Sequence, residues 1–139
     1  MPGSNAHFTT HVDDVAPASV RAERGWRQVD IRFLVTRDRA GTGSVCLFRA
    51  LFPPGAAHEA HRHPNADEVF YVVRGRPLLG AGAEERQARP GTVEFVAAGT
   101  VHWLRNPDPS EPVEVVGGYL GVGSLEEAGY ELGDGVHQS

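Results

Sequence analysis

The chain has 139 residues and carries 13 basic residues, all of them arginine, against 18 acidic ones, which gives a net charge of -5. This length fits one domain with one hydrophobic core, and the acidic balance argues against a nucleic-acid-binding surface, which needs dense positive charge. Cys46 is the only cysteine, so an intrachain disulfide and a cysteine-based zinc site are both excluded.

Residues 1–25 are polar and show no periodic pattern. They predict an N-terminal arm that either frays or docks on a partner subunit. The arm lacks the basic patch and apolar run of a signal peptide, and no apolar run in the chain is long enough to cross a bilayer. We therefore expect a cytoplasmic protein without a membrane partner, in agreement with its single, unpaired cysteine.

From residue 26 to residue 139 the pattern is that of one domain built from short strands between glycine and proline turns. Residues 36–44 predict a turn, and Ser124 to Glu127 match a helix capping box that ends at Gly129. The fold class is therefore all-β, an antiparallel sandwich or barrel with a short C-terminal helical turn. The predicted strands cover residues 29–35, 45–52, 68–73, 76–79, 84–88, 92–96, 101–104 and 113–119.

Three residues in the middle of the chain suggest a metal site. His61 and His63 are two apart in an extended segment, so their side chains project from the same face. Four residues that allow a tight turn follow, and Glu68 then opens the returning strand. Two imidazoles and a carboxylate suit a divalent transition metal.

These residues belong to two sequence motifs through which the chain resembles the cupin family. The first motif, G-x5-H-x-H-x4-E-x6-G, is matched without a gap by Gly55, His61, His63, Glu68 and Gly75. The second motif, G-x5-P-x-G-x2-H-x3-N, is matched by Gly91, Gly99, His102 and Asn106. Ala97 replaces the proline of the second motif. That proline stiffens a turn and is not a ligand, so the metal assignment is unaffected.

The resemblance covers residues 29–122 and implies a cupin-type antiparallel β-barrel, or jelly roll. It also implies one divalent metal ion inside the barrel, with iron(II) favoured and manganese, nickel, zinc or cobalt also suitable. Four protein ligands on a six-coordinate ion would leave two positions for water, dioxygen or substrate. A metal that only stabilises the fold is the alternative, although structural zinc is usually closed by four ligands. The implied ligands are His61, His63, Glu68 and His102.

Three classes of function remain open. The favoured one is an iron(II)-dependent oxygenase, such as a dioxygenase, acting on a small organic metabolite. The second is a redox-neutral cyclase, isomerase, decarboxylase or lyase of natural-product metabolism, polyketide cyclases included, with the metal as Lewis acid. The third is a non-enzymatic small-molecule-binding cupin. Too few residues precede the first predicted strand for a DNA-binding helix-turn-helix domain. Because cupins commonly pair, a homodimer is expected, with the arm as a plausible swapped strand.

Several side chains are candidates for a substrate pocket beside the metal. Phe70, Val72 and Leu104 share the strand parity of the ligands, although core packing explains them equally well. Arg49 could bind a substrate carboxylate, but an arginine at the rim with its charge in water is the simpler interpretation. No catalytic residue beyond the metal ligands is apparent.

The other polar and aromatic residues have simpler interpretations. His58 has the wrong parity to join His61, so we expect it in a loop. Trp103 and Tyr119 are expected in the core or an interface, and Asn106 is expected to cap a turn. The remaining histidines lie in terminal segments and are expected to be solvated; they are His7, His11 and His137.

Overall fold

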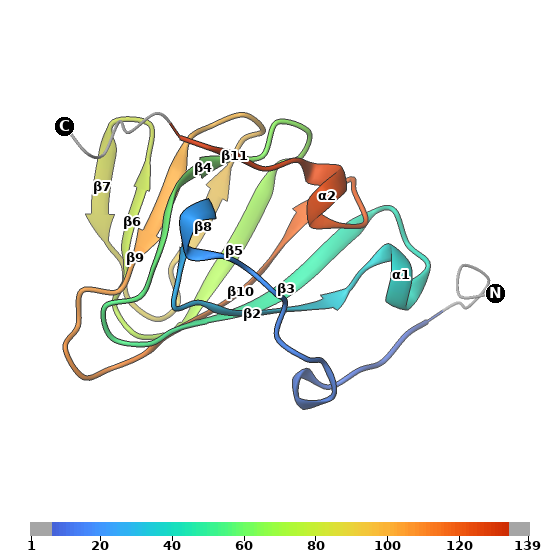
Figure 1. Cartoon of the computed structure of the whole chain (residues 1–139), viewed down its shortest axis with the longest axis horizontal. Coiled ribbons are helices and arrows are strands. Elements are labelled where there is room, and N and C mark those ends of the chain that lie inside the picture. Colours follow the sequence, from blue (N-terminus) through green and yellow to red (C-terminus); the bar gives the residue numbers. More distant parts are fainter. Residues whose placement is uncertain (1–6, 134–139) are drawn as a thin grey trace.

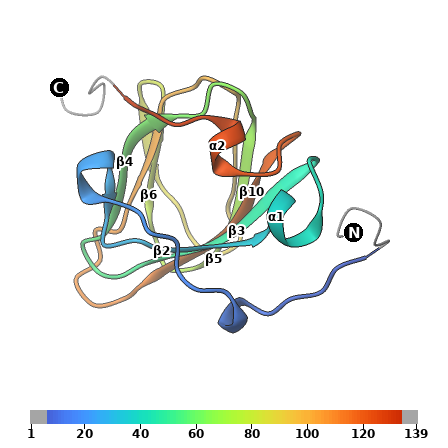
Figure 2. The same ribbon diagram turned by 45° about the vertical axis from the view of Figure 1, so that its right-hand side comes forward.

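The computed structural model describes residues 7–133, which form two antiparallel β-sheets that face each other and close into a barrel (Figures 1 and 2). The strands are β1 (Trp26–Arg27), β2 (Asp30–Val35), β3 (Val45–Phe52), β4 (Ala57–Arg62), β5 (Glu68–Arg74), β6 (Leu78–Ala81), β7 (Glu84–Gln87), β8 (Val93–Val96), β9 (His102–Arg105), β10 (Val113–Leu120) and β11 (Glu131–Leu132). One sheet has the order β1-β4-β9-β6-β7, with β11 also paired to β4, and the other has the order β2-β3-β10-β5-β8. The predicted all-β fold is confirmed.

Short helices lie at the ends of strands. α2 (Leu125–Ala128) begins as predicted, with the side chain of Ser124 accepting from the backbone of Glu127 at 3.0 Å. α1 (Arg37–Ala40) corrects the prediction of a plain turn over residues 36–44: the Thr36 side chain caps its start, and Gly41, at φ 74°, ends it. Two 3-10 turns, η2 (Val12–Asp14) and η3 (Ala22–Arg24), precede β1. No helix in residues 7–133 is long and apolar enough to cross a membrane.

The core lies between the two sheets and follows the alternation of the strands. In β3 every second residue is buried, and these are Cys46, Phe48, Ala50 and Phe52. Their side chains meet those of β5 and β10 in a single apolar cluster. The intervening residues of β3 therefore face outward, because successive side chains of a strand point to opposite faces.

The β6–β7 hairpin differs from its prediction in where its turn lies, and Trp103 packs across it. The predicted strands end at residue 79 and resume at residue 84, but β6 continues to Ala81 and the reversal follows at Gly82, with φ 62°. Gly80 therefore lies inside strand β6. A Cβ atom at this position would overlap the indole ring of Trp103. This glycine therefore provides space for packing.

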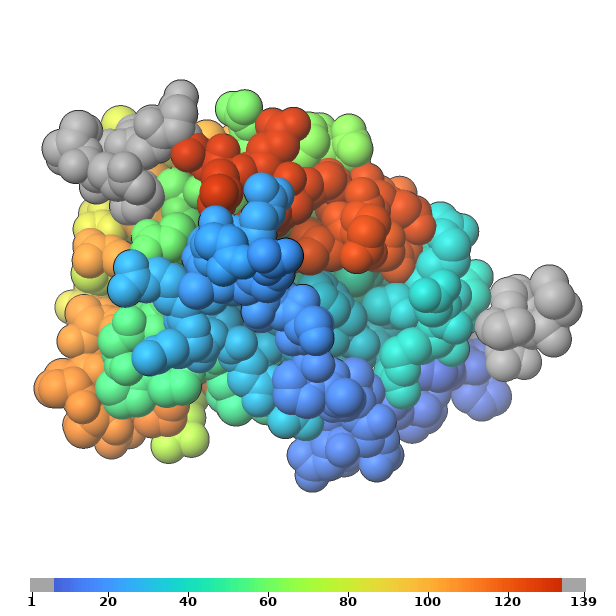
Figure 3. Space-filling model, viewed as in Figure 1, coloured from blue at the N-terminus to red at the C-terminus, as the bar shows by residue number. Residues whose placement is uncertain are grey.

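The N-terminal arm, where it is described, is docked on its own domain. The backbone of Ala18 donates to the carbonyl of Ile31 at 2.8 Å. The guanidinium of Arg32 donates to the carbonyls of Val12 and Val15 at 3.3 and 3.2 Å. The arm is therefore not frayed in this chain, and in Figure 3 its blue residues lie against the body of the domain. The prediction for residues 1–6 falls outside the described residues.

Two short strands that the sequence did not predict, β1 and β11, pair with the same edge of β4. Trp26 of β1 lies opposite His58, and Leu132 of β11 lies opposite His61. The hydroxyl of Tyr130, just before β11, donates to the carbonyl of Arg24, just before β1. Blue and red residues accordingly meet on one face in Figure 3. The two ends of the described chain thus cover the strand that carries the candidate site.

Candidate metal centre

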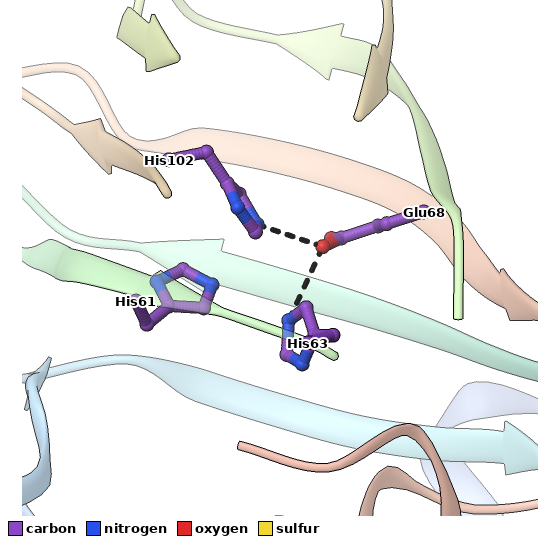
Figure 4. A group of neighbouring side chains, drawn as sticks. All are labelled: His61, His63, Glu68 and His102. Atoms are coloured by element: carbon purple, nitrogen blue, oxygen red, sulfur yellow. Dashed lines mark hydrogen bonds and ion pairs between the residues drawn. The ribbon is translucent and has the colours of Figure 1, made fainter. Parts of the chain in front are cut away.

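Four potential ligands from three segments converge inside the barrel (Figure 4). His61 lies in β4, His63 in the turn that follows, Glu68 at the start of β5 and His102 at the start of β9. Their donor atoms lie within 4.8 Å of one another, and each residue is at most 6% exposed. Metal–ligand bonds of about 2.1 Å would place two donor atoms on opposite sides of an ion about 4.2 Å apart. A small decrease in the separation of the four donor atoms would therefore suit a first-row metal ion.

Backbone carbonyls determine which nitrogen each imidazole directs toward the cluster. A carbonyl can only accept a hydrogen bond, so the Nδ1 atom beside it must carry the proton, and a neutral ring then has its free lone pair on Nε2. The carbonyls that accept from His61 and His102 belong to residues two positions earlier in the chain, whereas the carbonyl that accepts from His63 lies in the segment after α2. The Nδ1 atoms of His61, His63 and His102 lie 2.6, 2.8 and 2.9 Å from the carbonyl oxygens of Glu59, Gly129 and Thr100.

One nitrogen atom of the cluster forms no hydrogen bond within the described residues, and this observation bears on whether the four residues could bind a metal ion. Nε2 of His63 is buried and has no hydrogen-bond partner among the described residues, although it lies 3.3 Å from Oε1 of Glu68. Nε2 of His102 lies 2.9 Å from the same oxygen (dashed in Figure 4). Buried polar atoms without partners are rare and costly. A metal ion would satisfy all of these lone pairs, so the residues fit one.

The protonation states of two members of the cluster, Glu68 and His61, also suit a cation. Burial alone would raise the pKa of Glu68, but its hydrogen bond to His102 and its close contact with His63 outweigh burial and hold that pKa well below its usual range. Burial, with the neighbouring histidines, lowers the pKa of His61 well below its ordinary value. The cluster therefore contains a carboxylate and a neutral imidazole, the forms that bind metals.

His58 is not in a loop, as the sequence suggested, but inside β4 and 8% exposed. The pairing of β4 with β9 shifts register between His58 and His61, which marks a bulge. A bulge adds one residue and so breaks the two-residue period. As a result the His58 ring stacks at 3.5 Å on His61 and at 3.7 Å on Trp26, measured between ring centroids.

The hydrogen bonds of His58 define its state. Its Nε2 atom lies 2.9 Å from the hydroxyl of Tyr130, whose own proton goes to the carbonyl of Arg24. Nε2 of His58 is therefore the donor in this contact. Burial lowers the pKa of His58 well below its usual value, so the ring is neutral. The His58 ring packs against that of His61, a potential ligand, and His58 is not one of the four converging donors.

A small, mostly apolar cavity adjoins the cluster. About 30 Å³ is open to the centres of water molecules, which is room for a few waters or for a small group of a bound ligand. Of the predicted pocket residues, Phe70 and Leu104 line the cavity. Trp103 and Tyr119 are buried as expected, at 4% and 1% exposure, and they line it too.

Two of the predicted pocket residues lie elsewhere. Arg49 occupies an outward position of β3, where its guanidinium lies 3.4 Å from Glu114 and 4.0 Å from Asp30. Arg49 therefore does not line this cavity, because strand alternation places it on the other face of the sheet. Val72 is fully buried in the apolar core and is not among the residues that line the cavity.

The remaining sequence assignments concern turns and surface residues. Asn106 caps a turn as predicted: its amide donates to the carbonyls of Phe52 and Glu111 at 2.8 and 2.9 Å. His7 and His11 are exposed, as expected for an arm. His137 lies outside the described residues.

The sequence pattern did not reveal Glu94, a further carboxylate that lines the cavity. It lies in β8 directly opposite Phe70 of β5 and shares its inward face. Its neighbours Val93 and Phe95 face outward and are 59% and 60% exposed. An apolar-polar-apolar pattern normally indicates the reverse orientation, so only the pairing with β5 identifies Glu94 as an inward residue.

Comparison with known proteins gives a family for this chain. The model of the cupin domain matches residues 48–118, which include all four converging residues. The ureidoglycolate lyase of Rhizobium etli is 33% identical over 103 residues, covering 68% of this chain and 62% of the relative. The chain spans 44% to 62% of the length of the curated relatives it matches.

Solved structures show the same fold. The polyketide cyclase RemF from Streptomyces resistomycificus superposes with a TM-score of 0.74 at 19% identity, over 91% of this chain and 84% of that one. A predicted oxalate decarboxylase from Thermotoga maritima gives a TM-score of 0.71 at 18% identity, over 81% of this chain and 98% of that one. The matched domain, the two motifs and the double-sheet barrel with its buried His and Glu cluster establish that the chain belongs to the cupin family.

Proposed function

We propose that this cupin is a metal-dependent enzyme that acts on a small organic metabolite bound beside His61, His63, Glu68 and His102. The observation that carries the proposal is the convergence of four buried donors, with Nε2 of His63 lacking a hydrogen-bond partner among the described residues. The adjoining apolar cavity supports a reaction rather than a purely structural role. A structural metal needs no adjacent space, and structural zinc sites are typically closed.

The first candidate chemistry is iron(II)-dependent oxygenation. Three histidines and one carboxylate leave positions free on a six-coordinate ion, as oxygen-activating iron sites require. The chain's own contribution would be to exclude water: Phe70, Leu104 and Trp103 surround the space beside the donors. Bound there, iron(II) would supply the electrons for dioxygen activation, whereas a zinc-like ion would polarise a substrate oxygen.

Redox-neutral catalysis is the second candidate, and the name of one curated relative supports it. Ureidoglycolate lyase and a polyketide cyclase are among the similar proteins. Both names describe reactions that are not oxygenations. In this case the protein residues would position the substrate and transfer protons, and the reaction would not depend on dioxygen.

Oxygen uptake distinguishes the two candidates. The protein is loaded with iron(II) or with zinc, and catechol and simple hydroxyketones are supplied in air and under nitrogen. Oxygen consumption by the iron form alone, lost in His61→Ala, supports oxygenation. Turnover of the zinc form under nitrogen overturns oxygenation and supports the redox-neutral candidate. If the protein binds neither added ion, both candidates are wrong, and ligand binding without turnover would indicate a non-enzymatic binder.

We also propose that the chain forms a homodimer through the outer face of the five-stranded sheet. Five exposed apolar side chains share that face on β5, β8 and β10, and Tyr71 lies directly opposite both Val93 and Val116 in the sheet. A twofold axis would bring this face against its own copy. Light scattering should therefore give twice the mass of the chain, and Phe95→Glu should give the monomer mass. A monomeric wild type would refute the proposal. The five residues are Tyr71, Val73, Val93, Phe95 and Leu120.

A further inference from the structure

The edge strand β8 is inverted relative to the usual arrangement of a half-buried strand. It places the carboxylate of Glu94 on the cavity side and the apolar side chains of Val93 and Phe95 outside. Placing a carboxylate in a partly buried position costs free energy unless the group is paired. In the part of the chain that the structure describes, no hydrogen bond or ion pair to the Glu94 carboxylate is formed, and the nearby Arg86 pairs with Glu84 instead.

The charged side chains that line the cavity are acidic. Its charged lining residues are Glu68 and Glu94, and none of the described lining residues is an arginine. Glu68 belongs to the metal cluster, whereas Glu94 is not one of the four converging donors. A substrate with two negative charges would therefore meet only one source of positive charge, the metal, and would lie near an unpaired carboxylate. A neutral substrate would not incur this repulsion.

We propose that Glu94 is the proton acceptor for substrate binding, and that it selects neutral molecules with an acidic hydroxyl next to a carbonyl over dicarboxylates. This inference rests on the proposed function, because the substrate must bind at the metal. As the substrate binds, its O–H bond breaks and an O–H bond forms on the Glu94 carboxylate. The electron pair stays on the substrate oxygen, so charge is conserved and no further reactant is needed.

The environment of Glu94 suits this role. Burial raises its pKa; the charges of His102 and Arg86 oppose the shift, and that of Glu68 adds to it. A carboxylate whose pKa is raised toward neutrality is a better proton acceptor than an exposed one. The proton remains in the cavity and does not have to cross the apolar lining formed by Phe70 and Leu104.

Two small chelators test the proposal on the cobalt(II)-loaded protein. Acetohydroxamic acid is neutral and loses a hydroxyl proton when it binds a metal, whereas oxalate is a dianion with no proton to lose. Calorimetry in two buffers of different ionisation enthalpy gives both the affinity and the number of protons released to solvent. The variants are Glu94→Gln, which removes only the charge, and the exposed Glu111→Gln as the matched control.

For acetohydroxamic acid, wild type and Glu111→Gln should release close to no proton, and Glu94→Gln close to one proton per ligand. Glu94→Gln should bind acetohydroxamic acid about tenfold more weakly and oxalate about tenfold more tightly. Equal proton release in all three proteins, or a shift of both affinities in the same direction, overturns the role of Glu94 while the proposed function stands. Failure of all three proteins to retain cobalt overturns the proposed function and this inference with it.

Discussion

His61→Ala should abolish tight metal binding and leave the barrel folded, whereas His58→Ala should keep the metal. The two rings are stacked neighbours on β4 at 2% and 8% exposure, so truncating either one removes a comparable buried side chain. Each change should lower the free energy of unfolding of the metal-free protein by a similar amount, about 2–4 kcal/mol. Only His61 belongs to the four converging donors. Its loss should weaken metal affinity by about 100-fold or more, and the loss of His58 by about tenfold at most.

Thermal unfolding with and without added zinc measures the difference. At an ion concentration about 100 times the dissociation constant, binding stabilises the native state by about 2.7 kcal/mol. Wild type and His58→Ala should show a clear rise in melting temperature, and His61→Ala should show none. Equal loss of metal in both variants would contradict the assignment, because it would mean that the intact stack, and not ligation by His61, controls binding.

Gly117→Ala should destabilise the protein far more than Gly118→Ala, although the two glycines are adjacent in β10. A Cβ atom at Gly117 would overlap the backbone oxygen of Val69 and the side chain of Phe70. At Gly118 the nearest atom would be the carbonyl oxygen of Cys46 at 3.0 Å, which a slight shift can relieve. Neither glycine has a positive φ, so the difference reflects space alone. Overpacking of this kind costs about 1–3 kcal/mol, occasionally more.

Urea denaturation of the two variants provides the measurement. We expect Gly117→Ala to lower the free energy of unfolding by about 3 kcal/mol, or to yield no folded protein, and Gly118→Ala to lower it by about 1 kcal/mol or less. Similar midpoints for the two variants would show that β5 moves away from β10 without strain. Since Phe70 lines the cavity, a folded Gly117→Ala protein should also bind acetohydroxamic acid more weakly.

The fold class and three of the four converging residues were predictable from local patterns, and the fourth from the resemblance to the cupin family. Strand alternation and glycine turns identify most of the strands, and the spacing of His61, His63 and Glu68 follows from one turn between two strands. His102 was located through the second family motif, which the sequence carries in register. The capping residue of α2 was likewise visible in the sequence.

Features set by strand pairing were not predictable. The position of His58 depends on a bulge between β4 and β9, and the inward orientation of Glu94 depends on its pairing with Phe70. The short strands β1 and β11 carry no pattern of their own and exist because β4 offers them an edge. Arg49 was misplaced for a related reason: apolar residues lie on both sides of β3, so alternation alone did not reveal which face was inside.

The sequence by itself therefore determined the all-β fold class and the spacing of His61, His63 and Glu68, because periodicity and short-range spacing are properties of the chain alone. Its resemblance to the cupin family added His102 through the second motif. Tertiary structure decided what surrounds these four residues: the stack of Trp26 and His58 behind His61, the apolar lining, and the unpaired carboxylate of Glu94. These neighbours come from segments far apart in the sequence. Their placement depends on sheet register and bulges, where a shift of one residue turns a side chain from one face of the sheet to the other.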